Sequence, residues 1–469
     1  MTWSSTAAVT AELADFIAGT TWSDVPAEVI DKVTLHAADG IAAMMAASAR
    51  PWTEAARSLA RRESAAGHSA IIGHTARLRP GPAAFVNATA LHGLELDDYH
   101  VPAAVHAGCV VVPAGISVAE EIDARGRDLL TALAVGYEVT IRLGLAMSPE
   151  ITQDRGFHVT SSFGPLGAAA AAASLWQLDP TRTQHALGLA VAQAGGTTEF
   201  TRSGGEVKRL HAGFAAAAGI RSAELAQHGA TGPDHPIEGD RGFARSFGGR
   251  RVELDRLTDG LGETWHCDGL GIKAWSTCTG NHAALAALGT LQAQGLRTEE
   301  VESVRIYTDR TTAAHCGHLG PRVRSLTEAQ FSLHVTAAMA IALGGNDPSH
   351  YDLLERSAFE IPEVTRVATN TNVLVGEEQD RAFAHGLSAR VEVTLRNGAQ
   401  VEASASPPGS PENPFDWPEL LEKMYRSAAG YAGKAAIDDM VTGVRKWQLP
   451  ASRVRGALPR PAPGSPGSV

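Results

Sequence analysis

The chain has 469 residues, of which 44% are hydrophobic and 19% charged, which excludes a disordered or fibrous protein and favours two structural units. Its 40 Lys and Arg residues against 51 Asp and Glu residues give a net charge of -11, so we expect no nucleic-acid partner and no attachment to an anionic membrane. Four widely spaced cysteines, and an N-terminus without the basic and apolar regions of a signal peptide, predict a cytoplasmic protein with reduced thiols.

Most of the first 265 residues are predicted to be helical. Asp24 followed by Pro26 indicates one helix start, and Asp179 followed by Pro180 indicates another. Residues 161–178 carry no charge and are long enough to span a bilayer, but their alanine run and their Gly and Pro residues favour a buried helix of a soluble protein. Further helices, many of them rich in Ala and Gly, are expected at residues 80–96, 108–121, 126–146, 180–193 and 211–228.

The pattern changes in the last third of the chain. Residues 301–308 alternate as a strand does, and residues 389–395 and 400–404 predict a hairpin that turns at Asn397-Gly398. An apolar helix is expected between them, at residues 327–343, and two more at 417–428 and 434–447.

These elements predict a mainly α protein with two domains. Residues 1–269 and 405–448 form a large all-helical domain built from both chain ends, and residues 270–404 form a smaller inserted α/β domain. Residues 449–469 contain five prolines and are expected to be a disordered tail.

Several cofactor motifs are missing from the sequence. It has no phosphate-binding loop, no dinucleotide fingerprint, no C-x-x-C and no H-E-x-x-H, so we predict no nucleotide, metal or other cofactor. The nearest metal candidate is His315-Cys316-Gly317-His318, which we interpret as polar loop residues without a ligand role.

A cluster of acids and imidazoles between residues 92 and 106 is the first candidate site. Its carboxylates include Glu95 and Asp98, and its imidazoles include His106. An acidic helix end in solvent is the simpler alternative. However, the stretch that follows is apolar enough to be core, and acids near a core need partners such as histidines, which favours a site.

Three further segments carry polar chemistry. His158 opens a buried helix and could equally belong to a simple helix cap, whereas Lys208 and Arg209 form either an anion-binding group or a solvated basic turn. Lys273 and Cys278 lie at the expected domain boundary, where ligands usually bind. Together these groups suit proton abstraction next to a carboxylate, followed by loss of water or carbon dioxide or by reprotonation.

Ordered motifs along nearly the whole chain resemble the MmgE/PrpD family, which includes 2-methylcitrate dehydratase, cis-aconitate decarboxylase and iminodisuccinate epimerase. The resemblance implies an all-helical domain with a smaller α/β lid domain, a homodimer, and a cofactor-free site in the cleft between the domains. The motifs lie at residues 83–92, 97–98, 111–114, 156–158, 185–190, 208–213, 231–233 and 411–414.

The resemblance also implies site residues. The acidic first position of the family's D-x-D-D-T motif falls on Glu95 and its threonine on Tyr99, while its motif histidines fall on His106 and His158 and its lysine on Lys208. Glu95 and Tyr99 depart from the family pattern and reshape the pocket, so the known substrates cannot be assumed. The segment that enters the lid domain aligns with residues 273–278. The resemblance implies a histidine at the position of Cys278 in the decarboxylase, and its absence from this chain weighs against decarboxylation.

The leading hypothesis is a cofactor-independent lyase or isomerase acting on a small carboxylate, with dehydration first, epimerisation second and decarboxylation third. In it, Lys208 with Lys273 or Arg209 holds carboxylates, while His106, His158 and Tyr99 move protons. Glu95, Asp98 and Cys278 complete the substrate contacts. A tailoring enzyme for a larger substrate and a catalytically dead carboxylate-binding protein are the alternatives.

Overall fold

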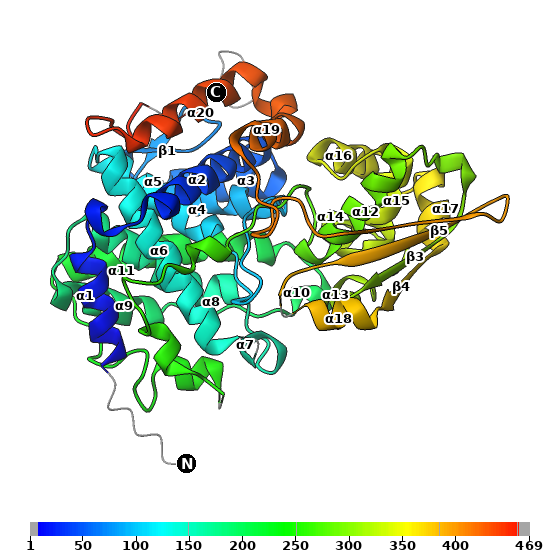
Figure 1. Cartoon of the computed structure of the whole chain (residues 1–469). Coiled ribbons are helices and arrows are strands. Elements are labelled where there is room, and N and C mark those ends of the chain that lie inside the picture. The colour runs from blue at the N-terminus through cyan, green and yellow to red at the C-terminus, as the bar shows by residue number, and fades with distance from the viewer. Residues whose placement is uncertain (1–7, 149, 250, 384, 457, 459–469) are drawn as a thin grey trace. The chain divides into compact units, whose positions relative to one another are not determined.

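The structure is a computed structural model that describes residues 8–148, 150–249, 251–383, 385–456 and 458, and it divides into two units (Figure 1). One, which we call the helical unit, contains the described residues up to 93, residues 97–270, and those from 431 onward. The other, the α/β unit, contains residues 94–96 and 271–430.

The helical unit is built from helices that surround a central apolar helix, α8. The order of its elements is α1 (Val9–Gly19), α2 (Ala27–Ala47), α3 (Pro51–Glu63), α4 (Pro80–Gly93), α5 (Gly108–Glu121), α6 (Gly126–Met147), α7 (Glu150–Gln153), α8 (Val159–Leu175), α9 (Pro180–Val191), α10 (Phe200–Ser203), α11 (Val207–Gln227) and α20 (Lys434–Arg445). A short antiparallel pair, β1 (Ala66–Ala70) with β2 (Arg77–Leu78), also belongs to it. The expected all-helical domain therefore includes one small sheet.

Small side chains let α8 pack closely against its neighbours α5, α6, α9 and α11. A Cβ atom on Gly219 of α11 would overlap Ala168 of α8, and one on Gly164 would lie 2.9 Å from the Cβ of Ala215. Such contacts bring helix backbones together without leaving voids. The uncharged stretch from residue 161 is buried in α8, as expected. Only α6, among the described helices, is long and apolar enough to cross a membrane, and 94% of its apolar window is buried in the protein.

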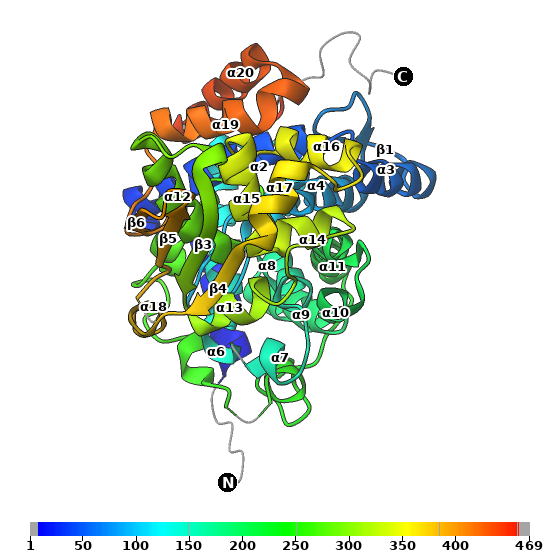
Figure 2. The same ribbon diagram turned by 90° about the vertical axis from the view of Figure 1, so that its right-hand side faces the viewer.

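The α/β unit has a mixed four-stranded sheet in the order β4-β3-β5-β6 (Figure 2). Strand β3 (Val301–Thr308) runs parallel to β4 (Thr371–Val375) and antiparallel to β5 (Ala389–Leu395), which pairs with β6 (Gln400–Ala405) across the expected hairpin. The helices of this unit are α12 (His282–Ala293), α13 (Arg310–Cys316), α14 (Leu326–Phe331), α15 (Leu333–Leu343), α16 (Pro348–Arg356), α17 (Pro362–Thr369), α18 (Glu377–Ala382) and most of α19 (Trp417–Ala432).

The expected single helix at residues 327–343 is two helices in the structure. Ser332 is extended between them, and its hydroxyl accepts the N–H of Val335 and donates to the carbonyl of Gly320. A serine that caps a helix in this way ends the preceding one.

The return to the helical unit comes later than the expected residue 405. Residues up to 430 cluster with the α/β unit because Ile272 N–H bonds to the Gly409 carbonyl at 2.7 Å and Lys423 of α19 donates to the Leu96 carbonyl.

The beginning of the expected disordered tail is folded. Val454 is buried, its N–H bonds to the Ala124 carbonyl at 3.1 Å, and the Arg455 guanidinium donates to the Glu120 carbonyl. These backbone partners fix the segment on the helical unit despite its proline content. Residues 457 and 459–469 lie outside the described residues.

Candidate active site

A buried carboxylate, Asp98, organises the loop between α4 and α5. Its Oδ2 accepts hydrogen bonds from the Tyr137 hydroxyl at 2.6 Å and His36 Nδ1 at 3.1 Å, and its Oδ1 accepts the Gly108 N–H at 2.9 Å. Gly108 begins α5, and any side chain there would collide with Asp98 and Tyr137. Burial and the negative charge of Asp98 raise the pKa of Tyr137 well above its ordinary value, so the phenol stays a donor. Asp98, expected as a substrate contact, thus holds the loop together.

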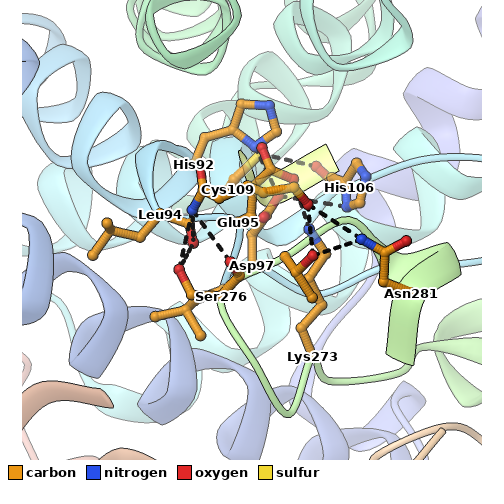
Figure 3. Close-up of polar contacts among 12 residues, drawn as sticks. His92, Leu94, Glu95, Asp97, His106, Cys109, Lys273, Ser276 and Asn281 are labelled. Carbon is orange, nitrogen blue, oxygen red and sulfur yellow. Dashed lines mark hydrogen bonds and ion pairs between the residues drawn. The ribbon is translucent and has the colours of Figure 1, made fainter. Parts of the chain in front are cut away.

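The neighbouring carboxylate, Asp97, is paired with imidazoles (Figure 3). Its Oδ2 lies 2.7 Å from His92 Nδ1, and both side chains are 0% exposed. The same oxygen lies 3.5 Å from Nδ1 of His106, whose side chain is 23% exposed. His106 Nδ1 also donates to the Asp98 carbonyl at 2.7 Å, which leaves Nε2 of a neutral His106 as the basic nitrogen.

The row of imidazoles continues beyond His92. The ring of His158, at the N-terminus of α8, stacks 5.8 Å from that of His92, which in turn lies 5.8 Å from His106. His158 Nδ1 lies 2.9 Å from Nδ1 of His211 in α11, so one of these nitrogens donates to the other. Phe200 packs edge-on against both rings of this pair. We call His106, His92, His158 and His211 the imidazole row.

Two members of the imidazole row, His158 and His211, are held in the neutral form. Burial, followed by the positive charge of nearby groups including Lys208, lowers the pKa of His158 well below 6.5. Burial and then Lys208 lower the pKa of His211 to about 4. Both imidazoles are therefore uncharged at neutral pH and can accept protons.

The two cations at the start of α11 have different surroundings. Lys208 is buried, and its positive charge acts on His158 and His211. The guanidinium of Arg209 donates to the Gly93 carbonyl at 2.9 Å, stacks 4.2 Å from the ring of Trp52 and bonds Glu206. Arg209 therefore joins α11 to the end of α4.

Tyr99 lies in the same loop as Asp97 and is 3% exposed. Beside it, His100 pairs with Val105 through two backbone hydrogen bonds, which closes the loop as a tight turn before His106. Tyr99, which aligns with the threonine of the family motif, is thus buried in the helical unit.

A second pair of charges lies within the α/β unit. Lys273 Nζ is 3.1 Å from Glu95 Oε2, and both side chains are almost fully buried (Figure 3). Glu95 adopts the left-handed backbone conformation, with φ of 53°, which is unfavourable for a residue with a side chain. The Leu94 carbonyl anchors this segment by accepting hydrogen bonds from Ser276 and Gln330. Cys278, the remaining expected contact in this unit, is half-buried.

One set of possible metal ligands occurs in the described part of the chain, formed by His92, Asp97 and Cys109, whose ligand atoms lie within 4.8 Å of one another. In the structure these atoms have protein partners, since His92 bonds Asp97 and the Cys109 thiol donates to the His106 carbonyl at 3.1 Å. Residues 315–318, which were expected in a loop, begin with the last two residues of α13, and their described side chains form no such group.

Two family models match the chain in the order of its two units. The MmgE/PrpD N-terminal domain matches residues 11–254, and the MmgE/PrpD C-terminal domain matches residues 275–447. The chain belongs to the MmgE/PrpD family. Its helical unit and α/β unit carry the two matched regions in chain order, with α20 as the exception because it returns to the helical unit.

Curated relatives of this MmgE/PrpD protein include cis-aconitate decarboxylases and one decarboxylase-like protein. The cis-aconitate decarboxylase-like protein oryM of Aspergillus oryzae is 30% identical over 448 residues, 90% of each chain. Cis-aconitate decarboxylase of Aspergillus terreus is 27% identical over 459 residues, 93% of each chain. The human cis-aconitate decarboxylase is 36% identical over 175 residues, 36% of each chain.

The residues that sequence reasoning selected in this MmgE/PrpD protein divide between the units. The helical unit contains Tyr99, His106, His158 and Lys208, together with Asp98 and Arg209, while the α/β unit contains Glu95, Lys273 and Cys278. His106 and His158 both flank the ring of His92.

Sequence reasoning missed several partners of these residues as members of the site. His92 and Asp97 lie in the acidic segment, and their spacing of five residues across a helix end was an available signal. His211 follows Lys208 by one helical turn and was also visible in its motif. His36 and Tyr137 had no local signal, because only tertiary packing brings them to Asp98.

Proposed function

We propose that this MmgE/PrpD protein is a lyase that releases carbon dioxide from a small unsaturated polycarboxylate similar to cis-aconitate. The observation that carries the proposal is the imidazole row beside Lys208, in which His92 is bonded to Asp97 and His106 lies 3.5 Å from the same carboxylate. The names of the curated relatives favour decarboxylation over the dehydration that the sequence placed first. Their identity of about 30% supports a lyase of this class and leaves the acid itself to the experiment.

The chemistry requires a cation and one proton donor. Decarboxylation of such an acid breaks the bond between one carboxylate and its allylic carbon. The electron pair then spreads through the neighbouring double bond toward a second carboxylate. A proton adds next to that carboxylate, and the double bond ends at the carbon that lost carbon dioxide. A cation facing the second carboxylate stabilises the charge that develops there.

The residues of the helical unit can supply these roles. Lys208 provides the positive charge that binds a carboxylate. His106, partly exposed and 3.5 Å from the Asp97 carboxylate, delivers the proton from its Nε2 atom, because its Nδ1 atom is bonded to the Asp98 carbonyl. His92, bonded to Asp97 at 2.7 Å, fixes the orientation of that carboxylate.

A hydro-lyase is the second candidate, favoured by the low pKa of His158. Decarboxylation needs a proton donor but no base, whereas elimination of water needs a base that is neutral at the working pH. His158 in its deprotonated form would take the α-proton, and His106 would protonate the departing hydroxyl.

The test is to incubate the purified full-length protein with cis-aconitate, 2-methylcitrate and iminodisuccinate in heavy water. Proton NMR then follows products and deuterium incorporation, and released carbon dioxide is measured separately. We expect stoichiometric carbon dioxide and one deuterium in the product of the tricarboxylic acid. Dehydration without carbon dioxide would support the hydro-lyase, exchange without net product would support an epimerase, and no reaction or exchange with any member would contradict both candidates.

Variants connect the activity to the site. His106→Gln and Lys208→Met should each lower kcat/KM by roughly 10²–10⁴-fold, the usual contribution of a general acid or a charge that stabilises the transition state. His228→Gln and Lys446→Met are matched controls because both side chains are exposed, and we expect wild-type activity from them. Equal losses in the site and control variants would remove the assignment.

A further inference from the structure

Two cysteines of the α/β unit contact each other through their side chains. Cys278 precedes the short helical turn at Thr279–Asn281, and Cys316 is the last residue of α13. Their thiol groups are close enough to influence each other's protonation, and Gly280, two residues after Cys278, packs against Thr312, one helical turn before Cys316. Cys278 is half-buried, whereas Cys316 is buried.

The backbone around the two thiols keeps them adjacent. The Cys278 N–H bonds to the Gln330 carbonyl, and the Asn281 N–H bonds to the Cys278 carbonyl, both at 3.0 Å. Gly280 packs directly against α13, since a Cβ atom there would lie 2.7 Å from Thr312 Oγ1. The turn that carries Cys278 therefore packs directly against α13, the helix that ends at Cys316.

The two sulfurs differ in protonation. The neighbouring Cys316 thiol is the largest influence on Cys278 and, helped by the Lys273 ammonium, it lowers the pKa of Cys278 to about 7, against the opposing effects of burial and of Glu95. The pKa of Cys316 is raised well above its ordinary value by the neighbouring Cys278 and by burial. Cys278 is thus the nucleophilic thiolate of the pair and Cys316 the proton donor.

The other two cysteines are both buried. Cys109 is buried and donates to the His106 carbonyl, and burial raises the pKa of Cys267 well above its usual range. They serve as internal references in the same molecule.

We propose that Cys278 and Cys316 are a peroxide-sensitive pair that forms a reversible disulfide. In the first step the Cys278 thiolate attacks hydrogen peroxide, the O–O bond breaks, and with one proton the products are a sulfenic acid and water. In the second step the Cys316 sulfur attacks that sulfenic sulfur, the S–O bond breaks, and a second water leaves. Each sulfur is oxidised by one electron equivalent while the peroxide is reduced by two, and a dithiol reverses the reaction.

The experiment uses the folded full-length protein and one equivalent of hydrogen peroxide near pH 7.5, followed by alkylation and peptide mass spectrometry. We expect a peptide pair linked through Cys278 and Cys316 that has lost two hydrogens and is released by dithiothreitol. The free thiol of Cys278 should disappear at least about ten-fold faster than the free thiols of Cys109 and Cys267. Oxidation of Cys278 to the sulfinic acid without the link, or equal rates for all four cysteines, would overturn the proposal.

Single variants test the roles of the two sulfurs. In Cys316→Ala, Cys278 should stop at a sulfenic acid that dimedone traps, and the midpoint of its alkylation rate against pH should rise from near 7 because alanine cannot donate to the thiolate. In Cys278→Ser, Cys316 should react no faster than Cys267. A Cys316→Ala protein with the wild-type midpoint would contradict the pairing. None of these readouts uses enzymatic activity, so the inference stands or fails separately from the proposed function.

Discussion

Acidification should destabilise the helical unit through the buried His158–His211 pair, and replacing His211 should reduce that sensitivity. The pKa of His211 is about 4 in the folded protein, against 6.5 for an ordinary histidine. Between these values the unfolded chain binds a proton that the folded chain does not. The contribution of the uncharged His211 to the unfolding free energy is therefore complete above pH 6.5 and is lost as the pH falls toward 4.

The size of this effect follows from the difference between the two values. A difference of roughly 2.5 pKa units, at about 1.4 kcal/mol each, makes about 3 kcal/mol of unfolding free energy depend on pH through His211. In His211→Gln this dependence should disappear. The variant also loses the 2.9 Å bond to His158, which costs about 1–3 kcal/mol at every pH. Its stability should thus be lower at pH 7.5 but decline less toward pH 4.5.

The assay is urea unfolding of the full chain at half-unit steps from pH 4.5 to 7.5, followed by far-UV circular dichroism. His228→Gln is the matched control, because this exposed histidine follows the last residue of the same helix. The reasoning is refuted if His211→Gln and wild type lose stability in parallel between pH 6.5 and 4.5.

Three further substitutions test the packing and the buried charges. Asp98→Ala should lower the unfolding free energy by roughly 3–5 kcal/mol, because it leaves the Tyr137 hydroxyl and other buried donors unpaired, while Asp98→Asn should cost clearly less in the same urea titration. Gly219→Ala should lower the melting temperature through an overlap of about 1–3 kcal/mol with α8, and an unchanged melting temperature would contradict the close contact. Lys273→Met should lower the unfolding free energy by about 3–5 kcal/mol, because it leaves the buried Glu95 carboxylate without its counter-charge. Adding Glu95→Gln should recover most of this loss, because the uncharged amide needs no counter-charge. Equal stability of that single and double variant would argue against the ion pair.

Local sequence patterns predicted most of the fold. The helix at Gly108–Glu121, the strand at Val301–Thr308 and the strand at Ala389–Leu395 have the expected ends, because glycine, proline and polar residues punctuate these segments. Strand β4 was not predicted, since Thr371–Val375 is short, lies at the sheet edge and gains its pairing from β3. The folded start of the tail escaped prediction because a tertiary contact outweighs its composition.

The candidate site was predictable only where its residues are close in the chain. His92 and Asp97 lie five positions apart, so their segment stood out as acidic and imidazole-rich. His158 and His211 are 53 positions apart, and their motifs marked each separately without indicating a direct bond. The hydrogen bonds of the Asp98 carboxylate could not be anticipated, because Asp98 lies in the loop between α4 and α5 and its partner Tyr137 lies 39 residues further on, in α6.

The small-residue composition is what makes the imidazole row possible. His92 lies on α4, His158 begins α8 and His211 lies on α11. Rings 5–6 Å apart on three different helices require backbones that approach closely, and Gly213 meets the Phe85 carbonyl of α4 where a Cβ atom would lie only 2.6 Å away. The neighbouring Gly219 allows the same approach of α11 to α8. The glycines that look like ordinary core packing in the sequence therefore set the distances between the imidazoles, and enlarging Gly213 should lower stability and also the proposed lyase activity.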